Sequence, residues 1–398
     1  MKKYFSRFLR AAASLLCIVS LCGCWNNREL ETLGIVMGLG LDTPEGDGGV
    51  QLTAQLIRPG ELRSGQNAGG DSGGGTGGGT ENFWNVQSTG DTVFSAVRDV
   101  TDQSSRRLFF PHNQVLIFGK AIAQEGVRQY IDFFVRDPET RDNVCVLVAE
   151  GSAKEILSVK PMLEKYPATK ITKMVEIQEK SASQVVAVRL GDFVKRLLST
   201  TAAPVAPMIR ASGEGEEPSL TITGTAVFKD DRLVGTLDKT EGRGLLWVLS
   251  EVKSGIINVE EPDGGGLVAL EIIRASGKMT PELRDGKIVM KINVKVEGNV
   301  GETTGKGSLA SNEALTKLEV SMAQAVHGEV FAAFQKAKAL TADIFGFGEA
   351  VRGKYLTEFK TMEGNWDEVF RTIELEVNVH AELRLTGRIN NPAVPQGE

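Results

Sequence analysis

The C-terminal part of the chain carries the longest regular pattern of apolar and polar residues. Over Asn312–Leu340 apolar side chains recur with the helical period of 3.6 residues for about eight turns, which predicts one long amphipathic helix. Two stretches that begin near Lys287 and Ile373 alternate apolar with mostly polar residues, a pattern typical of strands with one solvated face. We therefore expect a long helix that lies on an antiparallel sheet.

The first half of the chain mixes strand and helix patterns. Short apolar runs at 115–118 and 144–149 are interpreted as buried strands, whereas the segment 121–137 has apolar residues at helical spacing. Such mixing is typical of an α+β domain in which helices cover a sheet.

The middle of the chain has the signals of a hairpin and of a capped helix. Asp230 and Asp231 separate two apolar runs, and Asp238 with Glu241 has the spacing of a capping box at a helix start. Two further strands are expected on either side of the glycine-rich turn at 263–266. A unit of this size is small enough to depend on its neighbours for stability.

Changes of composition divide the chain into domains. Residues 59–80 are rich in glycine and predict a disordered excursion, and residues 200–218 are interpreted as a linker because of their proline, alanine, glycine and glutamate content. A chain of 398 residues exceeds what one hydrophobic core usually supports, so we expect an α+β protein of three domains. The predicted parts are a signal peptide (1–23), an N-terminal α+β domain (24–199), a small middle α+β domain (219–275), a C-terminal α+β domain (276–390) and a tail (391–398).

The N-terminus has the pattern of a bacterial lipoprotein signal. Residues 1–10 carry four basic residues and no acid, and the apolar run at 11–21 is too short for a membrane span of roughly 20 residues. The run ends in Leu-Cys-Gly-Cys at 21–24, which resembles a lipobox, in which the last cysteine receives a diacylglyceryl group before cleavage. We predict lipidation of Cys24, with an uncleaved anchor or an ordinary cleavage site as the alternatives.

The other cysteines fit this prediction. Cys17 and Cys22 would leave with the signal peptide, so Cys145 would be the one free thiol of the mature chain and no intrachain disulfide could form. Cys145 lies in an apolar, strand-like run, which favours a buried, inert thiol over a nucleophile. A zinc site is disfavoured because no second cysteine cluster supplies further ligands.

The charge argues against a nucleic-acid partner. The whole chain has 45 basic and 51 acidic residues, a net charge of −6, and without residues 1–23 it has 41 and 51, a net charge of −10. A body this acidic gains nothing overall from nucleic acid or anionic lipid. Acyl chains on Cys24 would therefore hold the protein at the membrane.

The sequence lacks the usual catalytic and metal-binding patterns. The three histidines, His112, His327 and His380, lie far apart and lack metal-type spacing. Asp137 and Glu139 could form an acid–base pair, but Asp-Pro-Glu is also a common turn sequence whose carboxylates serve the backbone. We predict that the protein is not an enzyme and uses no metal or cofactor.

Several longer motifs follow one another along the chain. They are CWNNREL (24–30), IVMGLGLD (35–42), the segment from FPHNQVLIFG to AKEIL (110–157), GTAVFKDDRLVGTL (224–237), DIFGFGEAVRGKY (343–355) and NWDEVF (365–370). Singly each motif is modest, but in this order they cover nearly the whole mature chain. Together they resemble one known family, the Ger(x)C family, which comprises the lipoprotein C subunits of nutrient germinant receptors in endospore-forming bacteria.

The resemblance implies more than the patterns alone. It implies three α+β domains, anchorage through Cys24 on the outer face of the spore's inner membrane, and assembly with integral-membrane receptor subunits of the A and B types. It implies no catalytic residues. The glycine-rich stretch at 59–80 is longer than we expect for the family.

Two other classes of protein share some of these features. An extracytoplasmic solute-binding lipoprotein of an importer would have a suitable length and anchor, but it should show two lobes of repeated strand–helix units. An envelope hydrolase would need a nucleophile and a base in one pocket, and the sequence offers no candidate.

Overall fold

The structure is a computed structural model that describes residues 4–5 and 32–385, apart from 47, 59–81, 214–217, 263–264, 306–308 and 310. Cys24, almost all of the predicted signal peptide, the predicted glycine-rich excursion at 59–80 and the predicted tail at 391–398 therefore lie outside the described residues.

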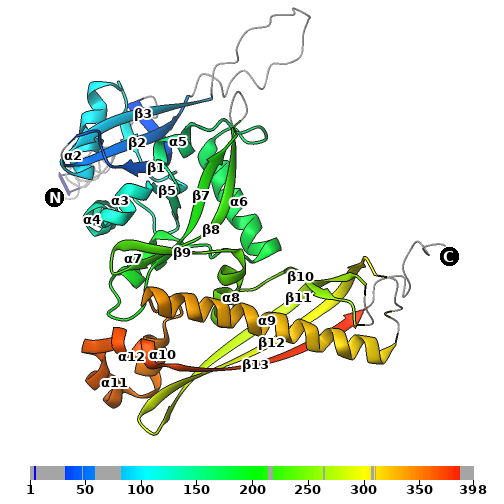
Figure 1. The fold of residues 1–398 in the computed structure, drawn as a ribbon. Coiled ribbons are helices and arrows are strands. Elements are labelled where there is room, and N and C mark those ends of the chain that lie inside the picture. Colours follow the sequence, from blue (N-terminus) through cyan, green and yellow to red (C-terminus); the bar gives the residue numbers. More distant parts are fainter. Residues whose placement is uncertain are drawn as a thin grey trace, which may run out of the picture.

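The described residues form two sheets (Figure 1). The first has the strand order β3-β2-β1-β5-β6-β7-β8-β9, and β4 pairs with the first residues of β1. Its strands are β1 (Leu33–Asp42), β2 (Val50–Ile57), β3 (Phe83–Gly90), β4 (Arg107–Phe109), β5 (Val115–Phe118), β6 (Cys145–Ala149), β7 (Val205–Ser212), β8 (Ser219–Lys229) and β9 (Arg232–Leu237). The second sheet has the order β10-β11-β12-β13, with β10 (Gly255–Glu260), β11 (Leu267–Arg284), β12 (Lys287–Thr303) and β13 (Glu374–Leu385).

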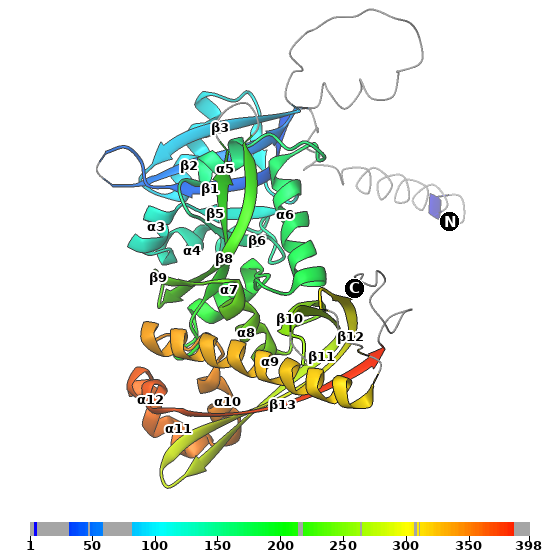
Figure 2. The ribbon, with the colours of Figure 1, turned by 45° about the vertical axis from the view of Figure 1, so that its right-hand side comes forward.

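Helices cover both faces of the first sheet. Its central strands β1, β5, β6 and β7 run parallel, and antiparallel hairpins extend it on both sides. Helices α5 and α6 pack on one face and α2, α3, α4 and α7 on the other (Figure 2). The helices of this half are α2 (Val93–Asp99), α3 (Lys120–Glu125), α4 (Arg128–Arg136), α5 (Ala153–Ser158), α6 (Pro167–Ile177) and α7 (Leu190–Leu197), with short η3 (Val100–Asp102) and η4 (Gln178–Ala182).

One face of the second sheet is covered mainly by one long helix, and two shorter helices, α8 (Lys239–Leu249) and α10 (Phe347–Lys354), also contact β11. The helix α9 spans Asn312–Leu340, as the sequence predicts, and Ser311 caps it by accepting a hydrogen bond from the N–H of Ala314. Its apolar face packs on even-numbered residues of β12 such as Ile292 and Val294. The remaining helices of this half are α11 (Leu356–Met362) and α12 (Trp366–Thr372), with short η5 (Glu363–Asn365).

The prediction of a purely antiparallel C-terminal sheet is wrong at its last strand. β13 pairs with β12 in parallel, with Met290 opposite Leu375. The reason is α9, whose 29 residues span about 43 Å and carry the chain back along the sheet before β13 begins. Strand, helix and parallel strand thus form one crossover unit, in a sheet whose other pairs are antiparallel.

The predicted linker at 200–218 is also wrong over its described part. Residues Val205–Ser212 form β7, in the interior of the first sheet. Most of the prolines and alanines that suggested a linker are buried, and the parallel ladder with β6 begins only at Met208, one residue after Pro207. Proline is tolerated in a strand where such a ladder is interrupted.

The segment 219–275, predicted to be a middle domain, is divided between the two sheets. β8 and β9 extend the first sheet, whereas β10 and β11 begin the second. The local predictions inside it are confirmed, because the β8–β9 hairpin turns at Asp230, which has a φ of 52°, and Asp238 and Glu241 form a capping box at the start of α8. The α+β class is confirmed as well.

Candidate functional site

The predicted lipidation residue, Cys24, lies outside the described residues, but the structure shows where the chain from it arrives. The described body begins at Thr32, and β1 starts at Leu33. Eight residue steps separate Cys24 from Thr32, so even a fully extended segment spans roughly 30 Å. If Cys24 carries acyl chains, the first strand lies close to the lipid.

We call the end of the first sheet at which β1 begins the anchor end. β1 runs antiparallel to β2 with Val36 opposite Leu56, so the end of β2 lies beside the start of β1. β4 starts there as well, because Leu33 pairs with Arg107, and the guanidinium of Arg106 donates to the carbonyl oxygen of Leu33 at 3.4 Å. Several strand ends therefore lie around the first residues of the body at the anchor end.

The histidines do not converge on a site. His112 is exposed beside Phe109, with 6.1 Å between ring centroids, and His327 is exposed on α9, stacked on Phe331. His380 lies on the solvated face of β13, as the alternating pattern predicts. Within the described ranges, no group of three or more His, Cys, Asp or Glu side chains has an arrangement that could hold a metal ion.

Cys145 is a buried thiol, as predicted. Its side chain is inaccessible to solvent in β6, and burial raises the pKa of the thiol to about 12. A thiol with so high a pKa carries almost no thiolate at neutral pH and is therefore a poor nucleophile.

The acidic pair at 137 and 139 has the structural role that the turn sequence indicates. The carboxylate of Asp137, just after α4, accepts a hydrogen bond from the N–H of Glu139 at 2.7 Å. The carboxylate of Glu139 in turn lies 3.9 Å from the guanidinium of Arg107. Both carboxylates thus stabilise the turn and the neighbouring strand.

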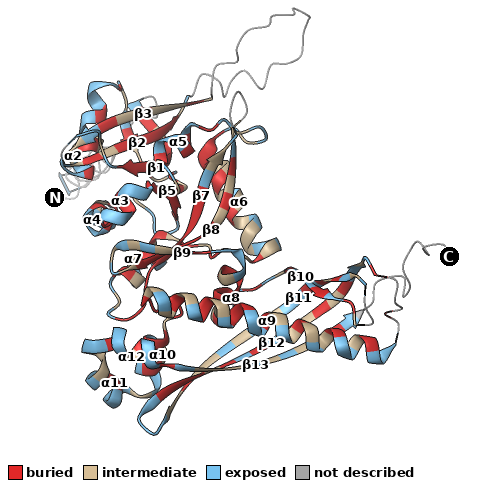
Figure 3. Ribbon diagram, viewed as in Figure 1, coloured by how far each residue is buried: buried red, intermediate tan, exposed pale blue. Residues whose placement is uncertain are grey.

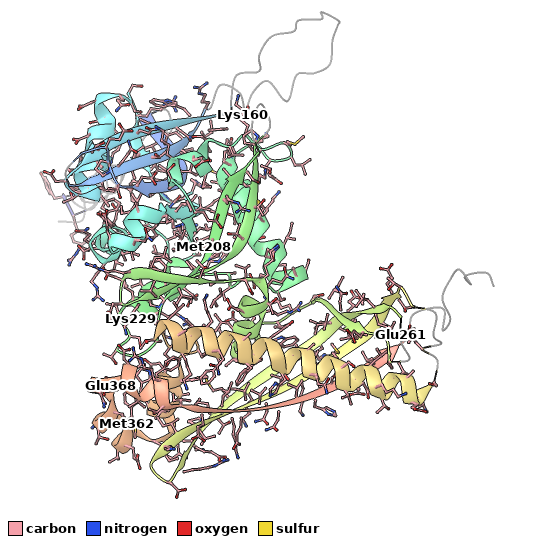
Figure 4. All side chains as sticks on the ribbon, viewed as in Figure 1. Lys160, Met208, Lys229, Glu261, Met362 and Glu368 are labelled. Atoms are coloured by element: carbon pink, nitrogen blue, oxygen red, sulfur yellow. The ribbon has the colours of Figure 1, made fainter. Side chains whose placement is uncertain are left out.

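An open hollow of about 520 Å³ lies between α3, β8 and β9. Its charged lining residues are Lys120, Glu150 and Asp238, and Met208, labelled in Figure 4, forms part of its wall. The residues that line it include no histidine, cysteine or serine. The hollow therefore lacks the usual combination of a nucleophile and a base.

A buried ion pair forms a junction between α8 and α9. Arg243 of α8 is 8% exposed and donates through Nε to Glu329 of α9 at 2.8 Å, and a second guanidinium nitrogen donates to the other carboxylate oxygen. The indole N–H of Trp247 also donates to Glu329 at 2.8 Å. The helices approach closely because residue 244 is glycine, where a Cβ would lie 2.0 Å from the carbonyl oxygen of Glu329.

A second junction is centred on Asp343. Its carboxylate is buried and accepts hydrogen bonds from three backbone N–H groups, those of residues 346–348, at 2.8–2.9 Å, and from the indole N–H of Trp366 at 3.1 Å. Burial raises the pKa of Asp343 to about 6, while these donors oppose the shift. Arg196 of α7 donates to the carbonyl oxygens of Ala203 and Ile344, which connects this junction to the first sheet.

Sequence reasoning missed both junctions. Arg243 and Glu329 are 86 residues apart, and no local pattern links them. Asp343 lies in the motif Asp-Ile-Phe-Gly-Phe-Gly, where the glycines at 346 and 348 were a usable signal of a backbone turn around a carboxylate.

No helix among the described residues is both long enough and apolar enough to cross a membrane.

Comparisons with known proteins identify the family. Residues 26–211 match the model of the spore germination protein N-terminal domain, and residues 223–387 match that of the spore germination B3/GerAC-like C-terminal domain. Spore germination protein KC of Bacillus subtilis (strain 168) is 28% identical over 96% of this chain and 97% of its own length. Spore germination protein B3 of the same organism is 24% identical over 92% of this chain and 94% of its own length.

A solved structure agrees with this assignment at the level of the fold. The crystal structure of the GerBC protein aligns with a TM-score of 0.57 and 19% identity, over 89% of this chain and 99% of that one. The family models follow one another along the chain and together cover most of it, which confirms the resemblance inferred from the sequence motifs. The chain is a member of the Ger(x)C family of spore germination proteins.

Proposed function

We propose that this protein is the lipid-anchored C subunit of a nutrient germinant receptor. In this proposal Cys24 is acylated and holds the protein on the outer face of the spore's inner membrane. The body acts in germination through contacts with integral-membrane subunits of the A and B types, and no catalytic step is assigned to it.

The observation that carries the proposal is family membership along nearly the whole chain, combined with the lipobox-like sequence at 21–24. The relatives are named as spore germination proteins, so a role in germination follows from the match, whereas the anchor is inferred from the residues around Cys24. The short distance between Cys24 and Thr32 is consistent with a body that works beside membrane proteins.

The arrangement of reactive groups favours contacts over catalysis. The histidines lie on separate surfaces, the one described thiol is buried, and the acidic pair serves the backbone of a turn. The fold also does not favour the solute-binding alternative, because the described strands form one mixed sheet and one four-stranded sheet instead of two similar doubly wound lobes.

The decisive experiment replaces the predicted lipidation residue in spores that lack the native gene. Cys24→Ala should abolish incorporation of labelled fatty acid and glycerol, release the protein from the inner membrane and remove one nutrient response. The matched control is Cys22→Ala, which leaves a small residue inside the lipobox and should preserve all three. A membrane-bound, fully responsive Cys24→Ala strain would overturn the proposed anchor.

A further inference from the structure

One loop of the first domain exposes two large apolar side chains completely. The loop connects α5 to α6 and spans residues 159–166. Leu163 is 97% exposed and Met162 is 82% exposed, the two highest values among the large apolar side chains of the described residues. Monomeric proteins expose single apolar residues routinely, but two adjacent and fully exposed ones at a loop tip suggest a contact.

The base of this loop is held rigidly to the sheet. The carbonyl oxygen of Leu157 accepts hydrogen bonds from the side-chain amides of Gln55 at 3.0 Å and Asn85 at 2.8 Å. The side-chain oxygen of Gln55 also accepts from the N–H of Ala168, the second residue of α6. Since both ends of the loop are bonded to the same buried glutamine, the exposed tip projects from a fixed base.

The loop lies at the anchor end. Gln55 is two residues before the last residue of β2, and Asn85 is two residues after the first residue of β3. Leu33, the first residue of β1, lies at this same end of the sheet. Figure 4 labels Lys160 of the loop beside the start of β3. The two most exposed apolar side chains and Leu33 therefore lie at one end of the first sheet.

The charges around the loop are mainly positive, although the protein as a whole is acidic. Lys160 and Lys165 flank the apolar pair, and Arg58 is exposed at the end of β2. The acid within the loop, Glu164, is bonded to Lys173 at 2.7 Å. Apolar residues between lysines suit the interface of a bilayer, where the apolar side chains enter the acyl boundary and the ammonium groups meet anionic headgroups.

We propose that Met162 and Leu163 insert into the bilayer interface beside the acylated Cys24 and so orient the first domain on the membrane. This inference rests on the proposed lipid anchor. A single tether of roughly 30 Å restricts distance but leaves the body free to rotate. A second contact at the same end fixes which surfaces of the protein face neighbouring membrane subunits and which face away.

The test uses the acylated mature protein, which begins at Cys24, in vesicles of phosphatidylcholine and phosphatidylglycerol that contain no other protein. Leu163→Cys is labelled with an environment-sensitive fluorophore, and quenching by brominated lipid reports contact with acyl chains. Labelling is specific because Cys24 is blocked by its lipid and Cys145 is buried. The matched control is Leu198→Cys, at an exposed leucine, 72% accessible, that follows α7.

We expect brominated lipid to quench the probe at 163 at least about twofold more strongly than the probe at 198, because interfacial residues lie about 5–10 Å deep. Equal quenching in vesicle-bound, acylated protein would overturn the loop insertion while leaving the anchor intact, and would mean that the apolar pair contacts a protein or remains in water. Protein that mass analysis shows to be unacylated and that does not stay on vesicles would overturn the anchor, and the insertion with it.

Discussion

The two sheets of this protein differ in how many of their faces are covered. In β5 of the first sheet, Ile117 and Phe118 follow one another and both are inaccessible to solvent. In β12 of the second sheet, Ile292 is inaccessible and the next residue, Asn293, is exposed. Figure 3 shows the contrast between the buried central strands of the first sheet and the partly exposed β13. A strand whose residues are all apolar needs helices on both faces of its sheet. A strand in which apolar and polar residues alternate needs helices on one face only.

The open face of the second sheet is covered by charged side chains. Lys291 lies 2.8 Å from Glu282 and 3.8 Å from Glu376, so charges of opposite sign alternate across three neighbouring strands. Such cross-strand pairs make a sheet face stable in water. In the N-terminal half, helices thus cover both faces of the sheet, and the proposed anchor holds this half at the membrane. The C-terminal half keeps a solvated polar surface.

The largest expected effect comes from breaking the buried ion pair between α8 and α9. Glu329→Gln removes the negative partner of Arg243 and leaves a buried guanidinium without its counter-charge. We expect the free energy of unfolding to fall by about 3–5 kcal/mol, the usual result of breaking a buried pair from one side. Denaturant unfolding measures the change.

The control for this prediction is an exposed pair. Glu150 lies 3.4 Å from Arg210, whose side chain is half exposed, so Glu150→Gln should cost less than about 1 kcal/mol. Equal losses in the two variants would contradict a special role for the buried junction.

The next prediction tests the difference between the sheets residue by residue. Ile117→Ala should cost about 2–5 kcal/mol, and so should Ile292→Ala, because both side chains are fully buried. Asn293→Ala should change stability by no more than about 0.5 kcal/mol, since its side chain faces solvent. Phe118→Ala, at the position after Ile117, should again be severe, at about 3–5 kcal/mol. A large cost at Asn293 would show that another part of the protein or a second copy covers the open face in solution.

Local signals explain what could be predicted from the sequence. The helix Asn312–Leu340 has a capping serine and a long apolar stripe, and the β8–β9 hairpin has aspartates at its turn. Both elements can therefore be predicted from residues close together in the sequence. The family could likewise be predicted, because its motifs are short and occur in a fixed order along the chain.

Features that depend on distant partners could not be predicted. Alternation in β13 shows which side chains are buried but not that the strand runs parallel to β12, and the alanines and prolines of β7 suit a linker as well as a tight interior position. The exposure of Met162 and Leu163 is also invisible in sequence, where two apolar residues ordinarily suggest core. Cys24 is a candidate because lipidation depends on a short motif, whereas the buried junctions depend on the finished fold.

The last prediction concerns the second junction and its dependence on pH. The folded-state pKa of Asp343, about 6, lies above that of an unfolded aspartate, so the native protein holds an extra proton between about pH 4 and 6. Asp343 therefore makes its full contribution to the free energy of unfolding below about pH 4. This contribution, about 2–3 kcal/mol, is lost as the pH rises through 6. Relative to Asp343→Asn, which cannot titrate, the wild type should therefore lose stability between pH 4.5 and 7 in denaturant unfolding.

The difference between the two proteins at a single pH is uninformative, since asparagine also replaces one acceptor oxygen by a donor and disturbs the hydrogen bonds from residues 346–348. That loss is the same at both pH values and cancels when the two differences are subtracted. A subtracted value near zero would mean that the four N–H donors fully offset the desolvation of the carboxylate. The junction would then be insensitive to pH, and the two halves would differ only in how the faces of their sheets are covered.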